Sequence, residues 1–100
     1  MNSNLLSHIN QLKSLCTEYK VDRVHLFGSQ ATNSYTEKSD IDLLVKFSDS
    51  INVLDYADNY FGLLEKLEYL FKKKIDLVSE RSLKNPILIS EINKTKISLV

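Results

Sequence analysis

The chain has 100 residues, a length typical of one domain, which would span residues 1–100 and leave no room for a separate acceptor-binding domain. Its 13 basic and 13 acidic residues give a net charge of zero, which makes nucleic acid an unlikely partner because nucleic-acid binders normally carry a basic excess. Cys16 is the only cysteine, so an internal disulfide is excluded. No apolar run approaches the ~20 residues of a membrane span, and the N-terminus lacks a basic and apolar signal segment, so we expect a cytoplasmic protein with no membrane partner.

The first predicted elements are a helix and a strand. Apolar residues recur at steps of three and four from Asn4 to Tyr19, which predicts an amphipathic helix with Cys16 on its buried stripe. Lys20 to Asp22 is predicted to form a turn, and Val24 to Phe27 a strand. Gly28 ends this strand, where a residue without a side chain allows a sharp turn or a close approach of the backbone to another group.

A polar segment separates the first strand from the second. Ser29 is a plausible N-cap of a short helical turn through Thr32, and the free N–H groups of such a turn suit a phosphate. After a polar loop from Ser34 to Lys38, the run Ile41 to Phe47 predicts a strand with alternate apolar residues facing the core. Alternation then places Asp40 and Asp42 together on the opposite face.

The remaining elements alternate between helix and strand. Asn52 to Phe71 is predicted to be a long helix, with Asn52 as its cap and a buried stripe listed below. A strand follows from Ile75 to Val78, then a short helix from Ile87 to Asn93 that begins after Asn85-Pro86, and a final strand within Lys96 to Val100. The stripe consists of Val53, Ala57, Phe61, Leu64, Leu67 and Phe71, with Tyr60 beside it. This order of elements predicts an α/β fold.

Three carboxylates form the candidate site. If Ile75 and Leu77 face the core, Asp76 faces outward, and adjacent strands would set it beside Asp40 and Asp42. Carboxylates this close repel one another unless a cation or a proton lies between them, and Mg²⁺ prefers such hard oxygen ligands together with substrate phosphates. Three acids beside a Gly-Ser turn therefore indicate metal-assisted phosphoryl or nucleotidyl transfer.

The chain resembles the minimal nucleotidyltransferases, the MNT group of the DNA polymerase beta-like superfamily. The resemblance covers most of the chain and depends on G-S-x-A at 28–31, a short polar loop, S-D-I-D-L-L-V at 39–45 and I-D-L-V at 75–78. Three positions depart from the family pattern: Gln30 and Thr32 stand where basic residues are frequent, and Asn33 stands where glycine is common.

The resemblance implies a fold, a reaction and a partner. The fold is a small mixed β-sheet flanked by helices, the polymerase beta-like nucleotidyltransferase fold. The reaction is Mg²⁺-dependent nucleotidyl transfer from ATP, with Gly28 and Ser29 binding the nucleotide and Asp40, Asp42 and Asp76 serving as catalytic residues that hold two Mg²⁺ ions. The partner is a HEPN toxin, which MNT antitoxins neutralise, in some cases by transferring AMP to a tyrosine.

Two alternative functions remain at the level of the sequence. A degenerate nucleotidyltransferase fold could neutralise a partner by contact alone, and Gln30, Thr32 and Asn33 keep this interpretation open. A small-molecule nucleotidyltransferase is the other alternative, against which the lack of a second domain argues. The sequence leaves open the acceptor, the base preference, the oligomeric state and whether catalysis is retained.

Overall fold

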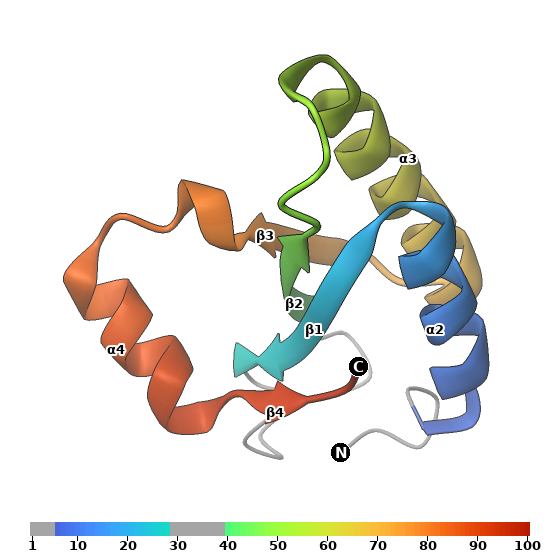
Figure 1. Cartoon of the computed structure of the whole chain (residues 1–100). Coiled ribbons are helices and arrows are strands. Elements are labelled where there is room, and N and C mark those ends of the chain that lie inside the picture. The colour runs from blue at the N-terminus through green and yellow to red at the C-terminus, as the bar shows by residue number, and fades with distance from the viewer. Residues whose placement is uncertain (1–5, 29–39) are drawn as a thin grey trace.

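The α/β fold predicted from the sequence is confirmed by the structure, a computed structural model that describes residues 6–28 and 40–100. Helices and strands follow one another along the chain as expected (Figure 1). Their bounds are α2 Ile9–Glu18, β1 Val21–Phe27, β2 Ile41–Phe47, α3 Val53–Phe71, β3 Ile75–Ser79, the 3-10 helix η2 Glu80–Ser82, α4 Pro86–Thr95 and β4 Ile97–Ser98.

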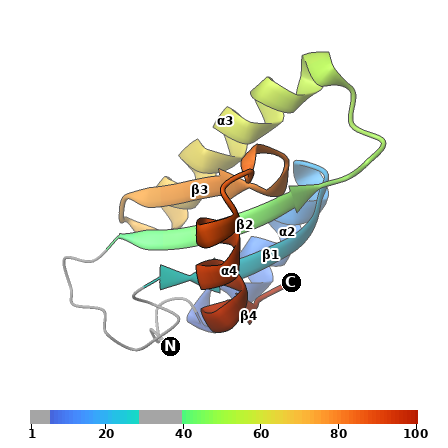
Figure 2. The same cartoon turned by 90° about the vertical axis from the view of Figure 1, so that its left-hand side faces the viewer.

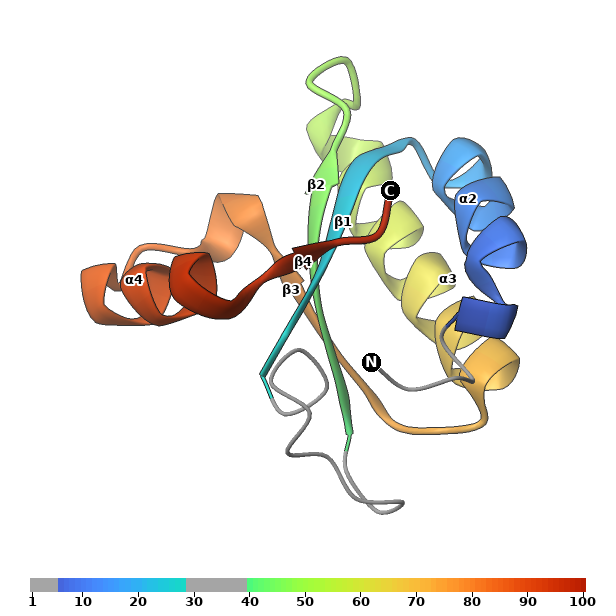
Figure 3. The same ribbon diagram turned by 90° about the horizontal axis from the view of Figure 1, so that it is seen from below.

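The four strands form one mixed sheet in the order β3-β2-β1-β4. The central pair β1 and β2 is antiparallel, β4 is antiparallel to β1, and β3 is parallel to β2. Helices α2 and α3 cover one face of the sheet, and α4 lies on the other side (Figures 1 and 3). The mixed sheet implied by the family resemblance is therefore present.

The hydrophobic core lies between the sheet and the pair α2 and α3. The apolar row of β2, from Ile41 to Phe47 at alternate positions, is buried there as predicted, which leaves Asp42 on the opposite face. Cys16 is buried in the same core, and burial raises the pKa of its thiol to about 11, so the side chain behaves as an inert apolar group.

The start of the first strand was predicted wrongly. Val21 lies in β1 instead of a turn, is buried and pairs with Phe47 of β2. The turn consists of Tyr19 and Lys20, and the φ of Lys20, 61°, lies in the left-handed region. The pairing register shifts between Val21 and Arg23, and this irregularity breaks the two-residue alternation by which a strand is recognised in a sequence.

The buried stripe of the long helix was also predicted wrongly in its first half. Val53, Ala57 and Phe61 are exposed, whereas Leu67 and Phe71 are buried as expected. Figure 2 shows the reason: α3 crosses the sheet obliquely, and its first turns extend past β3, the outermost strand. Val53, Ala57 and Phe61 face solvent there although their spacing suits a core helix, whereas Tyr56 and Tyr60 on the same turns pack against the core. The residues of α3 that the core buries or partly buries are Tyr56, Tyr60, Leu63, Leu64, Leu67, Leu70 and Phe71.

The C-terminal elements agree with the prediction. The Asn85 side chain caps α4 by accepting hydrogen bonds from the backbone N–H groups of Ile87 and Leu88, and Pro86 occupies the first helical position. β4 then pairs with the middle of β1. Within residues 6–28 and 40–100, we find no helix with the length and apolar character needed to cross a membrane.

Candidate active site

Gly28 and Asp42 meet where β1 ends and β2 begins. Phe27 is the pairing partner of Asp42 in the antiparallel register, so Gly28 follows directly beside that aspartate. A Cβ added to Gly28 would lie 2.2 Å from Oδ2 of Asp42, and the φ of Gly28 is 71°. Only glycine fits here, because a Cβ would overlap the Asp42 carboxylate and because residues with a side chain rarely adopt a positive φ. The close approach predicted for Gly28 is confirmed, and the group approached is a carboxylate.

Asp42 and Asp76 form a carboxyl pair across two strands. They are direct partners in the parallel register of β2 and β3, and both side chains lie on the sheet face opposite α2 and α3. Burial raises the pKa of Asp42 to about 6, helped by the charges of Asp76 and Asp40 and by a hydrogen bond with Asp76. When Asp42 is protonated, its hydroxyl can donate to the Asp76 carboxylate.

Asp40 completes the cluster from the start of β2. Its side chain is exposed, and its charge contributes to the raised pKa of Asp42, so all three predicted acids interact. Among the described residues, however, no group of three His, Cys, Asp or Glu side chains is gathered closely enough to hold a metal ion. The acids share one side of the sheet without converging on one point.

The chemistry of the three acids fits Mg²⁺. Hard carboxylate oxygens are its preferred protein ligands, and a divalent cation would offset the mutual repulsion that raises the pKa of Asp42. Convergence on one ion requires rotation of the exposed side chains of Asp40 and Asp76. Ser29 and the departures Gln30, Thr32 and Asn33 lie outside the described residues.

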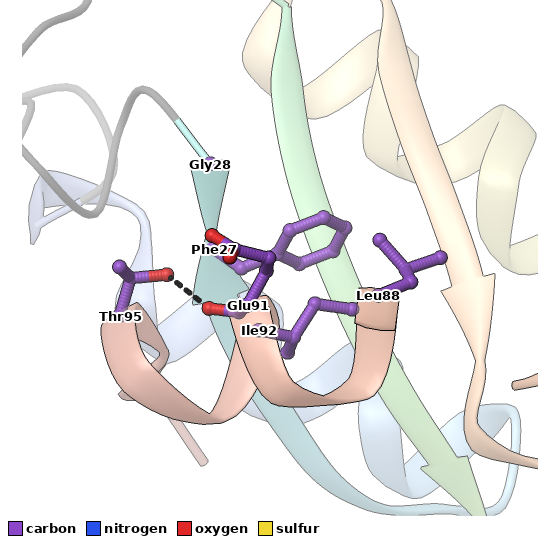
Figure 4. A pocket seen from close by; sticks show the side chains of 6 residues that line it. All are labelled: Phe27, Gly28, Leu88, Glu91, Ile92 and Thr95. Atoms are coloured by element: carbon purple, nitrogen blue, oxygen red, sulfur yellow. Dashed lines mark hydrogen bonds between the residues drawn. The ribbon is translucent and has the colours of Figure 1, made fainter. Parts of the chain in front are cut away.

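A cavity of about 320 Å³ opens beside Gly28, between the end of β1 and α4 (Figure 4). Its apolar walls are Phe27, Leu88 and Ile92. Its polar side chains are Glu91 and Thr95, and the Thr95 hydroxyl donates a hydrogen bond of 3.2 Å to the backbone carbonyl of Glu91. An apolar hollow with a few polar groups is typical of a small-molecule site.

This cavity was not predicted from the sequence, in which the last helix was predicted over Ile87 to Asn93 and no role was assigned to Glu91 or Thr95. A signal was present, since Leu88, Glu91, Ile92 and Thr95 recur at steps of three and four and so share one helical face. That face places a carboxylate among apolar residues, which an ordinary core helix avoids.

The family model for the nucleotidyltransferase domain matches residues 9–99. The chain belongs to this family. The resemblance inferred from the Gly-Ser and Asp-x-Asp motifs is therefore confirmed, and the protein is a nucleotidyltransferase.

Known proteins similar to this nucleotidyltransferase agree with that assignment. It is 38% identical over 82 residues to MJ1379 of Methanocaldococcus jannaschii, which is provisionally named a protein adenylyltransferase, and the match covers 82% of this chain and 80% of the relative. A solved structure, provisionally named a minimal nucleotidyltransferase, is 35% identical with a TM-score of 0.71, and the match covers 95% of this chain and 92% of that one.

One chain in the structure of a toxin–antitoxin complex from Shewanella oneidensis has the same fold as this chain. That structure contains a tri-AMPylated HEPN toxin bound to an MNT antitoxin. The matched chain is 23% identical to this one with a TM-score of 0.65, and the match covers 95% of this chain and 71% of that one. The likeness extends through nearly all of the fold described above.

Proposed function

We propose that this nucleotidyltransferase transfers AMP from ATP to a tyrosine hydroxyl of a HEPN-domain toxin in the cytoplasm, and thereby acts as an antitoxin. The observation that carries the proposal is the Asp42–Asp76 carboxyl pair, held against Gly28 with Asp40 nearby. A half-buried carboxyl group that faces two further negative charges is costly for a small fold, and a cation-dependent reaction supplies the reason to keep it.

Each acid has a role in this proposal. Asp40 and Asp42 would hold Mg²⁺ with Asp76 as a further ligand, and two ions are expected from the family resemblance. When bound, Mg²⁺ supplies positive charge to the oxygens of the α-phosphate. Asp76, exposed on the outermost strand, orients the acceptor hydroxyl and takes its proton. The acceptor oxygen bonds to the α-phosphorus, the bond to the bridging oxygen breaks, and pyrophosphate leaves.

The cavity beside Gly28 is proposed to hold the nucleotide base. Phe27, Leu88 and Ile92 supply apolar walls for a ring, and Gly28 brings the cavity next to Asp42. Glu91 can accept a hydrogen bond from an exocyclic amine, a group that adenine carries. Gly28 and Ser29 are proposed to hold the phosphates between the base and the acids.

The choice of a protein acceptor is supported by the relatives. MJ1379 carries the name of a protein adenylyltransferase, and the Shewanella oneidensis structure pairs an MNT antitoxin with a HEPN toxin that bears AMP. Complex formation with the acceptor would supply the orientation that a domain of 100 residues cannot provide by itself. Nucleic acid is not the expected acceptor, since the net charge is zero.

A contact-only antitoxin is the second candidate. One observation favours it: the described acids do not form a ready three-ligand group. In that case the fold would silence the toxin by covering it, with no nucleotide turnover.

Intact-mass spectrometry separates the two candidates. The proposed HEPN-domain partner is incubated with the antitoxin, ATP and Mg²⁺, and we expect AMP-sized mass additions that EDTA and Asp42→Asn abolish. A toxin that is silenced with no added mass would refute AMP transfer and leave the contact-only function.

A further inference from the structure

The first half of α3 presents large apolar side chains to solvent. Val53, Leu54 and Phe61 are 84%, 86% and 64% exposed, and Ala57 is exposed between them. At ~100° per residue these four positions fall within an arc of about 100° on one side of the helix. We call them the α3 patch. Contiguous exposed apolar surface of this kind marks an interaction site more often than chance exposure.

A groove, the hollow described next, continues the α3 patch along the edge of the sheet. The first turns of α3 extend past β3, the outermost strand (Figure 2), and a hollow of about 270 Å³ lies at this overhang. Ala57 and Phe61 belong to both the patch and the hollow, so the two form one surface. The hollow is lined by Tyr56, Ala57, Tyr60, Phe61, Leu77, Ser79 and Ser82.

The groove suits a rounded apolar surface better than an added strand. The Tyr60 hydroxyl donates a hydrogen bond to the backbone carbonyl of Leu77 in β3, so this acceptor at the edge strand is already engaged. An incoming strand would need that carbonyl free for its ladder of hydrogen bonds. A helix that lays apolar side chains into the groove requires no backbone partner.

The rim of the α3 patch is acidic. Asp58 and Glu65 stand three before and four after Phe61, the spacings at which side chains of a helix are neighbours, and Glu68 follows two turns after Phe61. The segment from Val53 to Glu65 contains no Lys or Arg. The first basic residue after this segment is Lys66, and Arg81 lies over the Tyr56 ring at 5.0 Å and donates to the Ser48 carbonyl.

We propose that the α3 patch is the docking surface for the acceptor protein, through an apolar helical surface rimmed by Lys and Arg. This inference rests on the proposed function and names the contact by which the acceptor is held. A second copy of this chain fits poorly, because a two-fold arrangement would set the acidic rim against itself. β3 borders the groove and carries Asp76 on its opposite face, so a partner wrapped around this edge reaches the acids.

Matched charge insertions on one helix test the proposal. Phe61→Glu and Leu54→Glu place a charge in the patch, whereas Tyr69→Glu places it at a residue 84% exposed on the same helix outside the patch. All three positions are exposed, so the variants should fold, as circular dichroism and melting would verify. We expect the two patch variants to bind the proposed HEPN-domain partner at least about tenfold more weakly in calorimetry, and Tyr69→Glu to match wild type.

Binding of ATP with Mg²⁺ by the isolated chain separates this inference from the proposed function. Patch variants that bind ATP normally but lose the complex support the docking surface. Equal complex formation by wild type and both patch variants overturns it, even where AMP transfer proceeds. A wild-type chain that sediments as a dimer, with Phe61→Glu monomeric, also overturns it, because the patch would then join two copies. Loss of the complex by the patch variants alone, with no AMP transferred by wild type, supports the surface and refutes the transfer reaction.

Discussion

The carboxylate of Asp42 lies directly against the backbone of Gly28, at a distance that leaves no room for a Cβ: the added atom would sit 2.2 Å from Oδ2. The glycine therefore sets the position of the aspartate, and the conformation of the strand end and the geometry of the acid pair are coupled. Gly28 therefore acts on the position of Asp42 itself, in addition to the phosphate contact proposed for it.

Gly28→Ala should damage the site more than the fold. The substitution requires a φ of 71°, which costs an L-residue about 1–2 kcal/mol, and it displaces Asp42 from its pairing with Asp76. We expect a Tm lower by several degrees and loss of ATP binding in the presence of Mg²⁺, measured by thermal shift and calorimetry.

Gly62→Ala is the matched control for that experiment. Its Cβ would lie 2.7 Å from Cε1 of Tyr19, so a ring at the α2–α3 contact must move. A comparable loss of stability is expected with ATP binding intact. If both alanine variants bound ATP equally well, Gly28 would have no special part in placing Asp42.

Asp42→Asn should stabilise the protein while it removes binding. The folded state raises the pKa of Asp42 from 3.8 to about 6, so the folded state holds that proton more tightly than the unfolded chain. The stability that this proton contributes is present below pH 3.8 and is lost as the pH rises through about 6. Asparagine has no such dependence and can still donate to Asp76.

The Tm of Asp42→Asn should therefore exceed that of wild type by roughly a few degrees at pH 7.5, with the gap closing toward pH 4. Mg²⁺ with ATP should raise the Tm of wild type only. Asp58→Asn, an exposed acid on α3, serves as the control and should show neither effect. A destabilised Asp42→Asn at pH 7.5 would contradict the raised pKa of Asp42, which burial and the charges of Asp76 and Asp40 cause.

Removing the cap of α4 and removing the cap of α3 should affect different surfaces: the cavity beside Gly28 in the first case and the α3 patch in the second. Asn85 caps α4, whose residues form one wall of the cavity, and Asn52 caps α3 by accepting from the Asp55 N–H at 2.9 Å. Either alanine variant should lose ~1 kcal/mol of stability. Asn85→Ala should weaken ATP binding in calorimetry, whereas Asn52→Ala should weaken the complex with the HEPN partner. The same profile from both variants would argue against separate roles.

Local patterns predicted most of the fold because they reflect direct neighbours. The alternation of apolar and polar residues along β2 predicted which face of the sheet carries Asp42, and the same alternation along β3 predicted the face that carries Asp76. The caps Asn52 and Asn85 marked the starts of their helices. The start of β1 at Val21 was not predicted, because the irregular register between Val21 and Arg23 interrupts the alternation of buried and exposed residues.

Contacts between distant segments could not be read in the same way. The approach of Gly28 to Asp42 depends on the register between two strands, and the exposure of Phe61 depends on the angle at which α3 crosses the sheet. Glu91 reaches the cavity because α4 lies over the end of β1, a placement that no residue spacing specifies. The side of the sheet that carries Asp42 and Asp76 was therefore predictable, while the cavity beside Gly28 and the exposure of the α3 patch required the structure.

Glu91 is expected to select the base. It is exposed on α4, and among the side chains that line the cavity it is the one that carries a charge. Its carboxylate accepts hydrogen bonds and donates none at neutral pH, so it favours a base edge that bears an amine. Inosine carries a carbonyl where adenosine carries that amine. The carbonyl oxygen and the Glu91 carboxylate are both hydrogen-bond acceptors, so no hydrogen bond could form between them.

We expect wild type to bind ATP about ten- to a hundredfold more tightly than ITP. Glu91→Ala should reduce this ratio to about one, largely by weakening ATP binding, and Glu65→Ala on α3 should leave the ratio unchanged. Competition of ATP and ITP for a fluorescent nucleotide measures the ratio directly. A wild-type protein that binds both nucleotides equally, or a Glu91→Ala variant that keeps the wild-type ratio, would place base recognition elsewhere.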